Sequence, residues 1–227
     1  MKYLNIEESY LTYLKLFDGL DIPFGAGKVA CDLSFNDYIT AKYLVNKKKY
    51  SKVYSLSYRN GIFYKNIYPL MITGNIAYTL SNIKSDFIIS LGGDYFFRPL
   101  YDVIFAISRS LYIGGKFLIA VYPDVFDESG RDVLGYLSNQ SSIPVKERFN
   151  RWFVSLKNAL TNIFVNIKTD EVIQDVSVDE IKRLFSLECF YKFVFSSSKE
   201  YEKFFHQIDD INKKVYLGWN IISGFRV

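Results

Sequence analysis

The stretch Ser85-Asp86-Phe87-Ile88-Ile89-Ser90 is the clearest buried strand of this 227-residue sequence. Residues 99–112 follow it with the apolar spacing of a helix, and Gly114-Gly115 predict the end of that helix. Residues 116–122 then form another short apolar run, which predicts the next strand. A strand, a helix and a strand in this order predict a right-handed crossover between parallel neighbours.

The same alternation continues on both sides of this unit. An amphipathic helix through Ile6 and Phe17 is expected to end near Gly19, and an extended run around Trp219 predicts a final antiparallel edge strand over 215–227. The remaining expected elements are strands at 29–33, 53–57 and 70–73 and a helix at 36–48. We therefore expect an α/β fold: a Rossmann-like, doubly wound, mostly parallel seven-stranded sheet with helices on both faces.

The sequence predicts one domain over residues 1–227. Residues 1–24 form its N-terminal helical segment, and residues 126–150, polar and glycine-containing at their start, are interpreted as a lid or insertion. Helical spacing returns over 149–160, around Trp152. Two capping-box patterns, Ser177 to Glu180 and Ser197 to Glu200, predict further helix starts.

Composition excludes several classes of function. The 28 basic and 24 acidic residues give a net charge of +4 and are interleaved, which argues against a nucleic-acid partner. Two cysteines and one histidine, His206, provide no metal-ligand pattern, so no metal is expected. The absence of an apolar signal-peptide core and of an apolar run of about 20 residues predicts a cytoplasmic protein without a membrane partner.

Two short features of the sequence resemble functional sites. The stretch Phe24-Gly25-Ala26-Gly27-Lys28 has the composition of a phosphate-binding loop but lacks its spacing, and it precedes a strand, so we interpret it as a turn. Asp94 follows the fourth strand after Gly92-Gly93, where a crevice residue would lie; a turn or helix-cap aspartate is the alternative. His206 lies in a charged helical stretch and is interpreted as a surface or half-buried residue rather than a catalytic base.

The order and spacing of these elements resemble the class I S-adenosylmethionine-dependent methyltransferases. The resemblance is clearest over residues 85–123, where the family's fourth strand, helix, glycine pair and fifth strand are matched, and it covers most of the chain. It implies S-adenosylmethionine as cofactor, bound at the carboxyl ends of the strands. It also implies that Ser90, which ends the fourth strand's apolar run, contributes to the cofactor site.

The family's cofactor loop has an acidic residue followed by three alternating glycines. In this sequence Asp32 matches the acidic residue, while Ser34, Asn36 and Tyr38 replace the glycines. Those glycines let the backbone approach the cofactor and adopt positive φ without steric cost. Asn36 tolerates positive φ better than most residues, whereas Tyr38 is not a neutral replacement.

The resemblance also assigns residues after the second and third strands. Ser57 stands where the family carries an acidic residue that accepts both ribose hydroxyls, and losing a charged acceptor would cost about 1.5–3 kcal/mol of binding free energy. Asn75 stands where an aspartate often faces the adenine amino group, and its amide oxygen could still accept that hydrogen bond. Ile76 could pack on the base.

These departures leave three functions open. In the first, the chain is an active methyltransferase with a small-molecule acceptor; Asp94 and Tyr95 are the candidate catalytic residues. Its candidate substrate contacts are Tyr10, Tyr13 and Trp152, although packing in the core is the alternative for the two tyrosines. In the second, the chain is a non-catalytic scaffold or partner subunit that has lost cofactor binding and contacts a protein. In the third, it binds another nucleotide or metabolite. The sequence identifies neither the methyl acceptor nor an oligomeric state.

Overall fold

The computed structural model describes residues 13–57, 64–72, 75–93, 97–121, 123–130, 145–186, 199, 202, 206 and 214–227; the side chains of residues 57, 145–151, 185 and 186 are not described. The chain forms two compact units. One comprises residues 1–20, 123–153 and 171–219, and the other comprises residues 21–122, 154–170 and 220–227. We refer to them as unit 1 and unit 2. The single-domain organisation stays a prediction.

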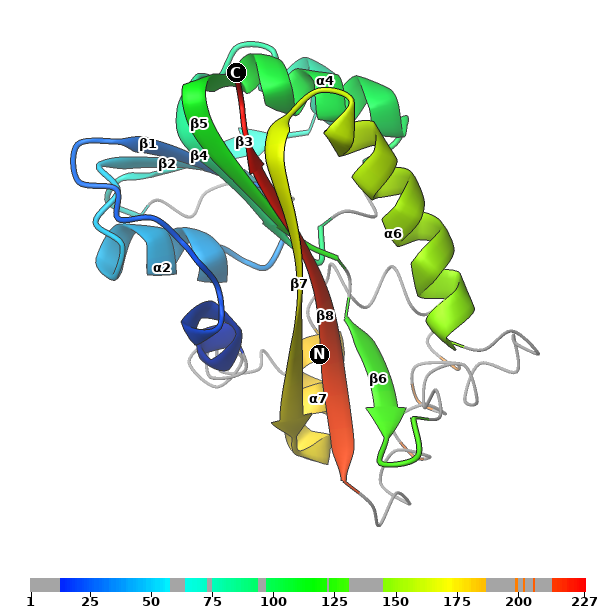
Figure 1. Cartoon of the computed structure of the whole chain (residues 1–227). Coiled ribbons are helices and arrows are strands. Elements are labelled where there is room, and N and C mark those ends of the chain that lie inside the picture. Colours follow the sequence, from blue (N-terminus) through cyan, green and yellow to red (C-terminus); the bar gives the residue numbers. More distant parts are fainter. Residues whose placement is uncertain are drawn as a thin grey trace. The chain divides into compact units, whose positions relative to one another are not determined.

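Unit 2 is built on a parallel sheet. Its strands are β1 (Val29–Asp32), β2 (Lys52–Ser57), β3 (Ile67–Met71), β4 (Ser85–Leu91) and β5 (Leu111–Ala120). They lie in the order β3-β2-β1-β4-β5, and all four pairings are parallel. The second half of β8 (Val215–Phe225) pairs antiparallel with β5, from Ala120 opposite Ile221 to Lys116 opposite Phe225. This confirms the predicted mostly parallel sheet with an antiparallel C-terminal strand (Figure 1).

Two further strands, β6 (Asp124–Asp127) and β7 (Val165–Val176), also pair with β8, so the described residues form a sheet of eight strands, one more than predicted. Most side chains of β7 are exposed, and Lys168, Asp170 and Glu171 are among its polar residues. A strand with so little apolar surface lacks the periodicity by which buried strands are found in a sequence.

Helices cover both faces of the unit 2 sheet. Figure 1 shows α2 (Ile39–Asn46) on one side of the strands and α4 (Leu100–Ser110) on the other. The short helix α3 (Ile76–Leu80) packs beside α4, and the Ser110 hydroxyl donates a 2.7 Å hydrogen bond to the carbonyl of Leu80. Apolar residues of α4 are buried against the sheet because they recur at helical spacing.

The glycine pair after α4 lies elsewhere than the sequence predicts. The helix ends at Ser110, and Gly114-Gly115 lie inside β5 instead of closing the helix. The pairing between β4 and β5 is irregular there, changing from Ser85 opposite Leu111 to Phe87 opposite Lys116. Gly114 has a φ of 77°, a conformation that glycine adopts without steric cost and that suits a local irregularity in a strand.

Unit 1 has an aromatic core around Trp219, whose indole nitrogen donates a 3.1 Å hydrogen bond to Oε1 of Gln174. The ring of Tyr13 lies 6.4 Å from that of Trp219 and 6.0 Å from that of Phe17. Residues 13–18 are helical, which agrees with the predicted first helix, and the backbone N–H of Gly19 bonds to the carbonyl of Leu16.

The capping box at Ser177 is confirmed at the start of α7 (Val178–Ser186). The Ser177 N–H donates to Glu180 Oε2 at 2.8 Å, and the Glu180 N–H donates to Ser177 Oγ at 3.1 Å. Glu180 also forms a 2.8 Å ion pair with Lys15. The helix predicted around Trp152 corresponds to α6 (Val145–Thr161), which belongs in part to each unit.

Three other expectations can be compared with the structure. The turn at Gly25 is confirmed, since the Lys28 N–H bonds to the Gly25 carbonyl at 2.9 Å and Gly27 has a φ of 75°. Residues 126–150, interpreted as a lid or insertion, begin within β6 and end within α6, and residues 131–144 lie outside the described part of the chain. The capping box predicted at 197–200 also falls mainly outside it.

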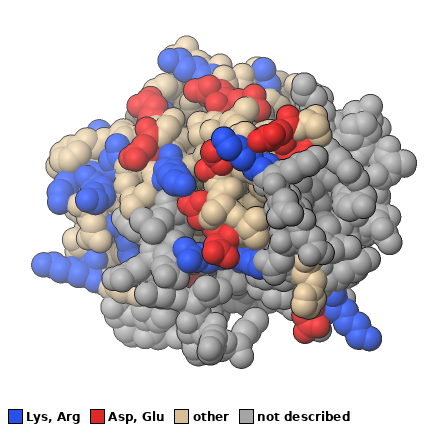
Figure 2. All heavy atoms as spheres, turned by 90° about the horizontal axis from the view of Figure 1, so that it is seen from below, with Lys and Arg blue, Asp and Glu red and all other residues tan. Residues whose placement is uncertain are grey.

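On the face drawn in Figure 2, acidic and basic side chains of the described residues are interspersed, and this agrees with the mixed charges of the sequence. Within the described ranges, none of the helices combines the length and apolar character that crossing a bilayer requires.

Candidate functional site

The strand order creates one switch point in unit 2. From β1 the chain continues to β2 and β3 on one side, and it returns to β4 on the other side of β1. The segments that follow β1 and β4 therefore leave the sheet in opposite directions, and ligands of doubly wound folds bind where this happens. We call the segments 32–38 and 90–93 the switch-point loops.

Asp32 is the last residue of β1, and its side chain is fully buried. Its Oδ1 accepts the backbone N–H of Ser34 at 2.9 Å, and its Oδ2 accepts the hydroxyl of Ser55 at 2.8 Å. Ser55 is directly opposite Asp32 in the pairing of β1 with β2. Both carboxylate oxygens thus hold the first switch-point loop and the neighbouring strand in place.

Burial raises the pKa of Asp32 above its ordinary value because it disfavours the charged carboxylate. Hydrogen bonds from Ser34, from the Ser55 hydroxyl and from the backbone of Ala41 lower the pKa and oppose this effect. A carboxyl group with a perturbed pKa at the switch point of such a sheet is a candidate functional residue.

Cys31, next to Asp32, is a fully buried thiol, and burial raises its pKa well above the ordinary value. Because only the thiolate reacts with alkylating agents, we expect Cys31 to stay unmodified by iodoacetamide in the folded protein and to be modified in denaturant. Peptide mass spectrometry after treatment with and without urea checks this. Equal modification of Cys31 in both samples would contradict its burial in β1.

The two switch-point loops contact each other closely. The Ser34 hydroxyl accepts the N–H of Leu91 at 3.0 Å, and the Leu33 N–H donates to the carbonyl of Ile89 at 2.7 Å. Gly93 packs so tightly that an added Cβ would lie 2.0 Å from the Leu33 carbonyl oxygen. The backbones at this point are therefore held by hydrogen bonds and by close packing.

The first loop has an unusual backbone for a segment without glycine. Phe35, Asp37 and Tyr38 have φ values of 53°, 52° and 66°. Of the three positions at which the family carries glycine, only Tyr38 adopts positive φ; Ser34 and Asn36 do not. Each such residue costs about 1–3 kcal/mol, and conformations of this kind cluster at functional sites.

The start of α2 is satisfied within the protein. The carbonyl of Asn36 accepts the N–H of Ile39 at 3.0 Å, and its Oδ1 accepts the N–H of Thr40 at 3.2 Å. Its Nδ2 donates to Thr40 Oγ1 at 2.7 Å. Asn36 is thus the polar residue that holds the first turn of the helix, and its side chain is only 1% exposed.

The other predicted cofactor residues lie at the carboxyl ends of neighbouring strands. Ser57 ends β2, and its side chain lies outside the described ones. Asn75 caps α3, with its Oδ1 accepting the N–H of Ala77 at 2.8 Å, and Ile76 is buried. Ser90 in β4 is fully buried, with its hydroxyl 3.4 Å from the Leu33 carbonyl.

Three of the predicted catalytic and substrate residues, Asp94, Tyr95 and Tyr10, lie outside the described residues. Tyr13 packs in the core of unit 1, which is the packing alternative stated above, and Trp152 is partly buried on α6 in the same unit. His206 is exposed, as expected.

The structure adds three polar or close contacts that the sequence did not reveal: Ser55 on Asp32, Thr40 on Asn36, and Gly93 on Leu33. Ser55 could have been noticed as a serine between the apolar residues of a predicted strand. Its contact with Asp32, however, depends on strand register, which one sequence does not show.

No protein-family model matches the sequence, and no curated protein matches it. Solved structures do match. YjhP from E. coli has a TM-score of 0.55 at 12% identity, with 100% of this chain and 96% of that one covered. Phosphoethanolamine N-methyltransferase 2 from Haemonchus contortus, in complex with phosphomonomethylethanolamine and S-adenosylhomocysteine, has a TM-score of 0.53 at 12% identity over 96% of this chain.

The present chain covers 52% of that Haemonchus enzyme and so spans about half of its length. A third structure is geranyl diphosphate C-methyltransferase from Streptomyces coelicolor A3(2), in complex with Mg2+, geranyl diphosphate and S-adenosylhomocysteine. It has a TM-score of 0.50 at 12% identity, with 96% of this chain and 79% of that one covered. Together with the strand order and its antiparallel last strand, these likenesses show that the chain has the fold of class I S-adenosylmethionine-dependent methyltransferases.

Proposed function

We propose that this protein is an S-adenosylmethionine-dependent methyltransferase that acts on a small-molecule acceptor. The observation that carries the proposal is the buried Asp32 carboxyl group at the switch point between β1 and β4, held by Ser34 and Ser55. Enzymes with this fold that have been crystallised with S-adenosylhomocysteine support it.

In this proposal the cofactor is held by residues from four strand ends. Asp32 at the end of β1, with Ser34 and Asn36 in the loop after it, would fix the backbone that holds the methionine part of the cofactor. Asn75 already uses its Oδ1 to cap α3, but an amide oxygen has a second lone pair that can accept the adenine amino group. Ser57 at the end of β2, Ile76 at the start of α3 and Ser90 near the end of β4 complete the set.

The cofactor supplies an activated methyl group on a sulfonium sulfur. The protein then has to orient the acceptor and exclude water, and this requires few obligatory side chains. Asp94 and Tyr95 are proposed to contact the reacting acceptor because they follow β4 at the switch point.

A second function is favoured by a different observation. Phe35 and Tyr38 are 5% and 3% exposed, and their large side chains stand in a loop where the family has small residues. If they occupy the space of the methionine part, the protein is a non-catalytic scaffold or partner subunit that binds a protein instead.

Substitution of Ser57 by Asp tests the two functions by a gain of binding. An aspartate at the end of β2 supplies the charged acceptor for the ribose hydroxyls, so we expect S57D to bind S-adenosylhomocysteine about ten- to a hundredfold more tightly than the wild type. Isothermal titration calorimetry measures both dissociation constants. A gain cannot result from misfolding of the variant.

The matched control is S51D, which adds the same charge next to β2 at its amino end. Ser51 precedes the first residue of the strand and is exposed, so the affinity should be unchanged. Absence of binding in both the wild type and S57D would reject the methyltransferase proposal and favour the scaffold. An equal gain in S51D would show that charge alone, and not position, had changed the affinity.

A further inference from the structure

One face of α4 carries both large aromatic and charged side chains in contact with solvent. Tyr101 and Phe105 are 61% and 55% exposed, and Asp102 and Arg109 are also exposed. Residues 101, 105 and 109 follow one another at intervals of four, so their side chains form a row along the helix. The opposite face carries the buried residues Val103, Ile104, Ala106, Ile107 and Ser110.

The neighbouring helix extends this surface. Tyr78 on α3 is 69% exposed, and α3 packs beside α4. Within the row, the Arg109 guanidinium lies 5.5 Å from the centre of the Phe105 ring. We call Tyr78, Tyr101, Asp102, Phe105 and Arg109 the α4 face. Exposed aromatic residues in one layer, rimmed by charges, are typical of protein contacts.

The charges of the α4 face are self-complementary. Asp102 is in the first turn of α4 and Arg109 in its last turn. They are separated by about 10.5 Å along the axis, which is too far for an ion pair within one helix. When two copies of α4 lie antiparallel around a two-fold axis near residue 105, Asp102 of each copy faces Arg109 of the other. Phe105 then lies beside the axis and packs against its own counterpart.

We propose that the α4 face is the contact surface of a homodimer in which two copies of α4 pack antiparallel. Two-fold contacts are isologous, so the same patch must match itself, and opposite charges three and four residues to either side of a central aromatic residue meet that condition. A partner of uniform charge would be attracted by one end of the face and repelled by the other. A contact of one helix pair is smaller than the standard interface of about 1,600 Å2, so the dimer is weak and depends on concentration.

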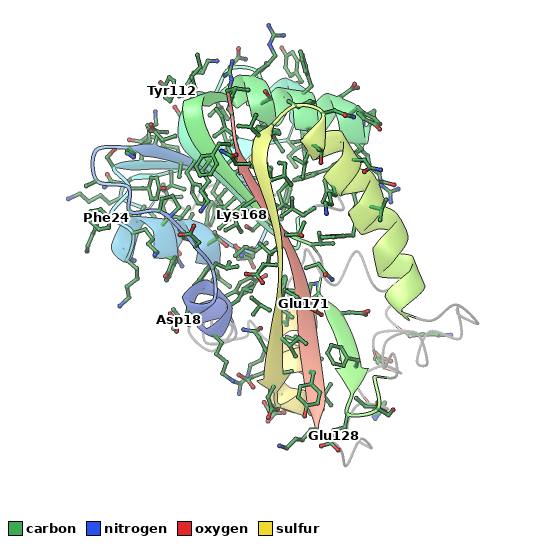
Figure 3. The ribbon with its side chains drawn as sticks, in the orientation of Figure 1. Asp18, Phe24, Tyr112, Glu128, Lys168 and Glu171 are labelled. Atoms are coloured by element: carbon green, nitrogen blue, oxygen red, sulfur yellow. The ribbon has the colours of Figure 1, made fainter. Side chains whose placement is uncertain are left out.

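Sedimentation equilibrium of the full chain without cofactor measures the association, and its result does not depend on the proposed methyltransferase activity. F105D places a carboxylate beside its counterpart at the axis, and we expect the dissociation constant to rise about tenfold or more. The control is F24D. Phe24 is similarly exposed, at 63%, but lies in the turn before β1, away from Tyr112, which is in β5 two residues after the end of α4 (Figure 3). It should leave the association unchanged.

Charge reversal tests the antiparallel arrangement. D102R and R109D each place like charges opposite one another and should weaken the dimer, whereas the double variant D102R/R109D restores opposite pairs and should return the dissociation constant towards the wild-type value. Asp102 and Arg109 also complement the dipole of α4. Each reversal removes one of these favourable interactions, so the double variant should have the lowest thermal stability even though it associates better than the single variants. Association and thermal unfolding, measured on the same samples, therefore separate the two roles.

Three results would overturn the proposal. The wild type could remain a monomer from micromolar to millimolar concentration. F24D could weaken association as much as F105D does. The double reversal could associate less than either single reversal. Circular dichroism of each variant confirms that it is folded before its association is compared.

Discussion

Substitution of Gly93 by Ala is expected to destabilise the protein by about 3 kcal/mol or more, because forced overpacking costs 1–3 kcal/mol even where flexible side chains can yield. The added Cβ would lie 2.0 Å from the Leu33 carbonyl oxygen and 2.8 Å from Ser90 Oγ. The closest atom belongs to the backbone, so relief requires the two switch-point loops to separate. Urea unfolding monitored by circular dichroism gives the change in free energy.

G19A is the matched control. Its Cβ would lie 3.3 Å from Cγ2 of Val172, a side-chain atom that can move by a few tenths of an ångström. Neither Gly19 nor Gly93 has a left-handed φ, so both substitutions test space alone. If G93A were no more destabilising than G19A, the close contact between the loops would be refuted. In the proposed function G93A also weakens cofactor binding, because the crevice is formed by the same loops.

Removal of the Asp32 carboxyl group has the second large effect. In D32A the Ser34 N–H and the Ser55 hydroxyl lose their acceptor while still buried, and we expect a loss of about 3 kcal/mol in the free energy of unfolding. D32N keeps an amide oxygen for the Ser34 N–H and can donate to Ser55, so it should cost about 1 kcal/mol or less. Equal losses for the two variants would show that the hydrogen bonds contribute nothing.

The pH dependence of this comparison follows from the raised pKa of Asp32. In the unfolded chain the carboxyl group ionises near its ordinary pKa of about 3.9. The folded protein holds its proton to higher pH, so the free energy of unfolding decreases as pH rises from that value to the folded-state pKa. D32N lacks this decrease. The wild type is therefore expected to lose stability relative to D32N between low and neutral pH, as measured by urea unfolding at each pH.

Strands buried on both faces were predictable from the sequence. The expected strand at 29–33 corresponds to β1 at Val29–Asp32, and the run around Phe87 corresponds to β4. Both pair with a neighbour on each side, and continuous apolar runs are the signal of such strands.

Edge and exposed strands were predicted less well. The strand expected at 70–73 spans Ile67–Met71, because the half-exposed Tyr68 and the proline at 69 interrupt the apolar pattern. The sequence predicts that β5 starts at residue 116, because Gly114-Gly115 resemble a helix end, whereas the strand starts at Leu111. Local patterns cannot distinguish a glycine that ends a helix from one that permits an irregular strand.

For the candidate site, the sequence indicates which strand ends contribute residues, but it does not show which hydrogen bonds their side chains form. Asp32 was found through the resemblance, whereas its bond to Ser55 depends on register. Asn75 was expected to face a ligand, and the structure shows its oxygen capping α3. An asparagine before an apolar helix start fits both roles, and the three-dimensional structure distinguishes them.

The pairing of β5 with β8 has a consequence for synthesis of the protein. Ala120 ends β5, but its partner Ile221 is translated roughly 100 residues later, which takes about 5–20 s at 5–20 residues per second. Until then the growing polypeptide on the ribosome presents β5 as an open edge. Unpaired edges recruit strands from other chains, so nascent molecules on one messenger RNA are exposed to mutual aggregation during that interval.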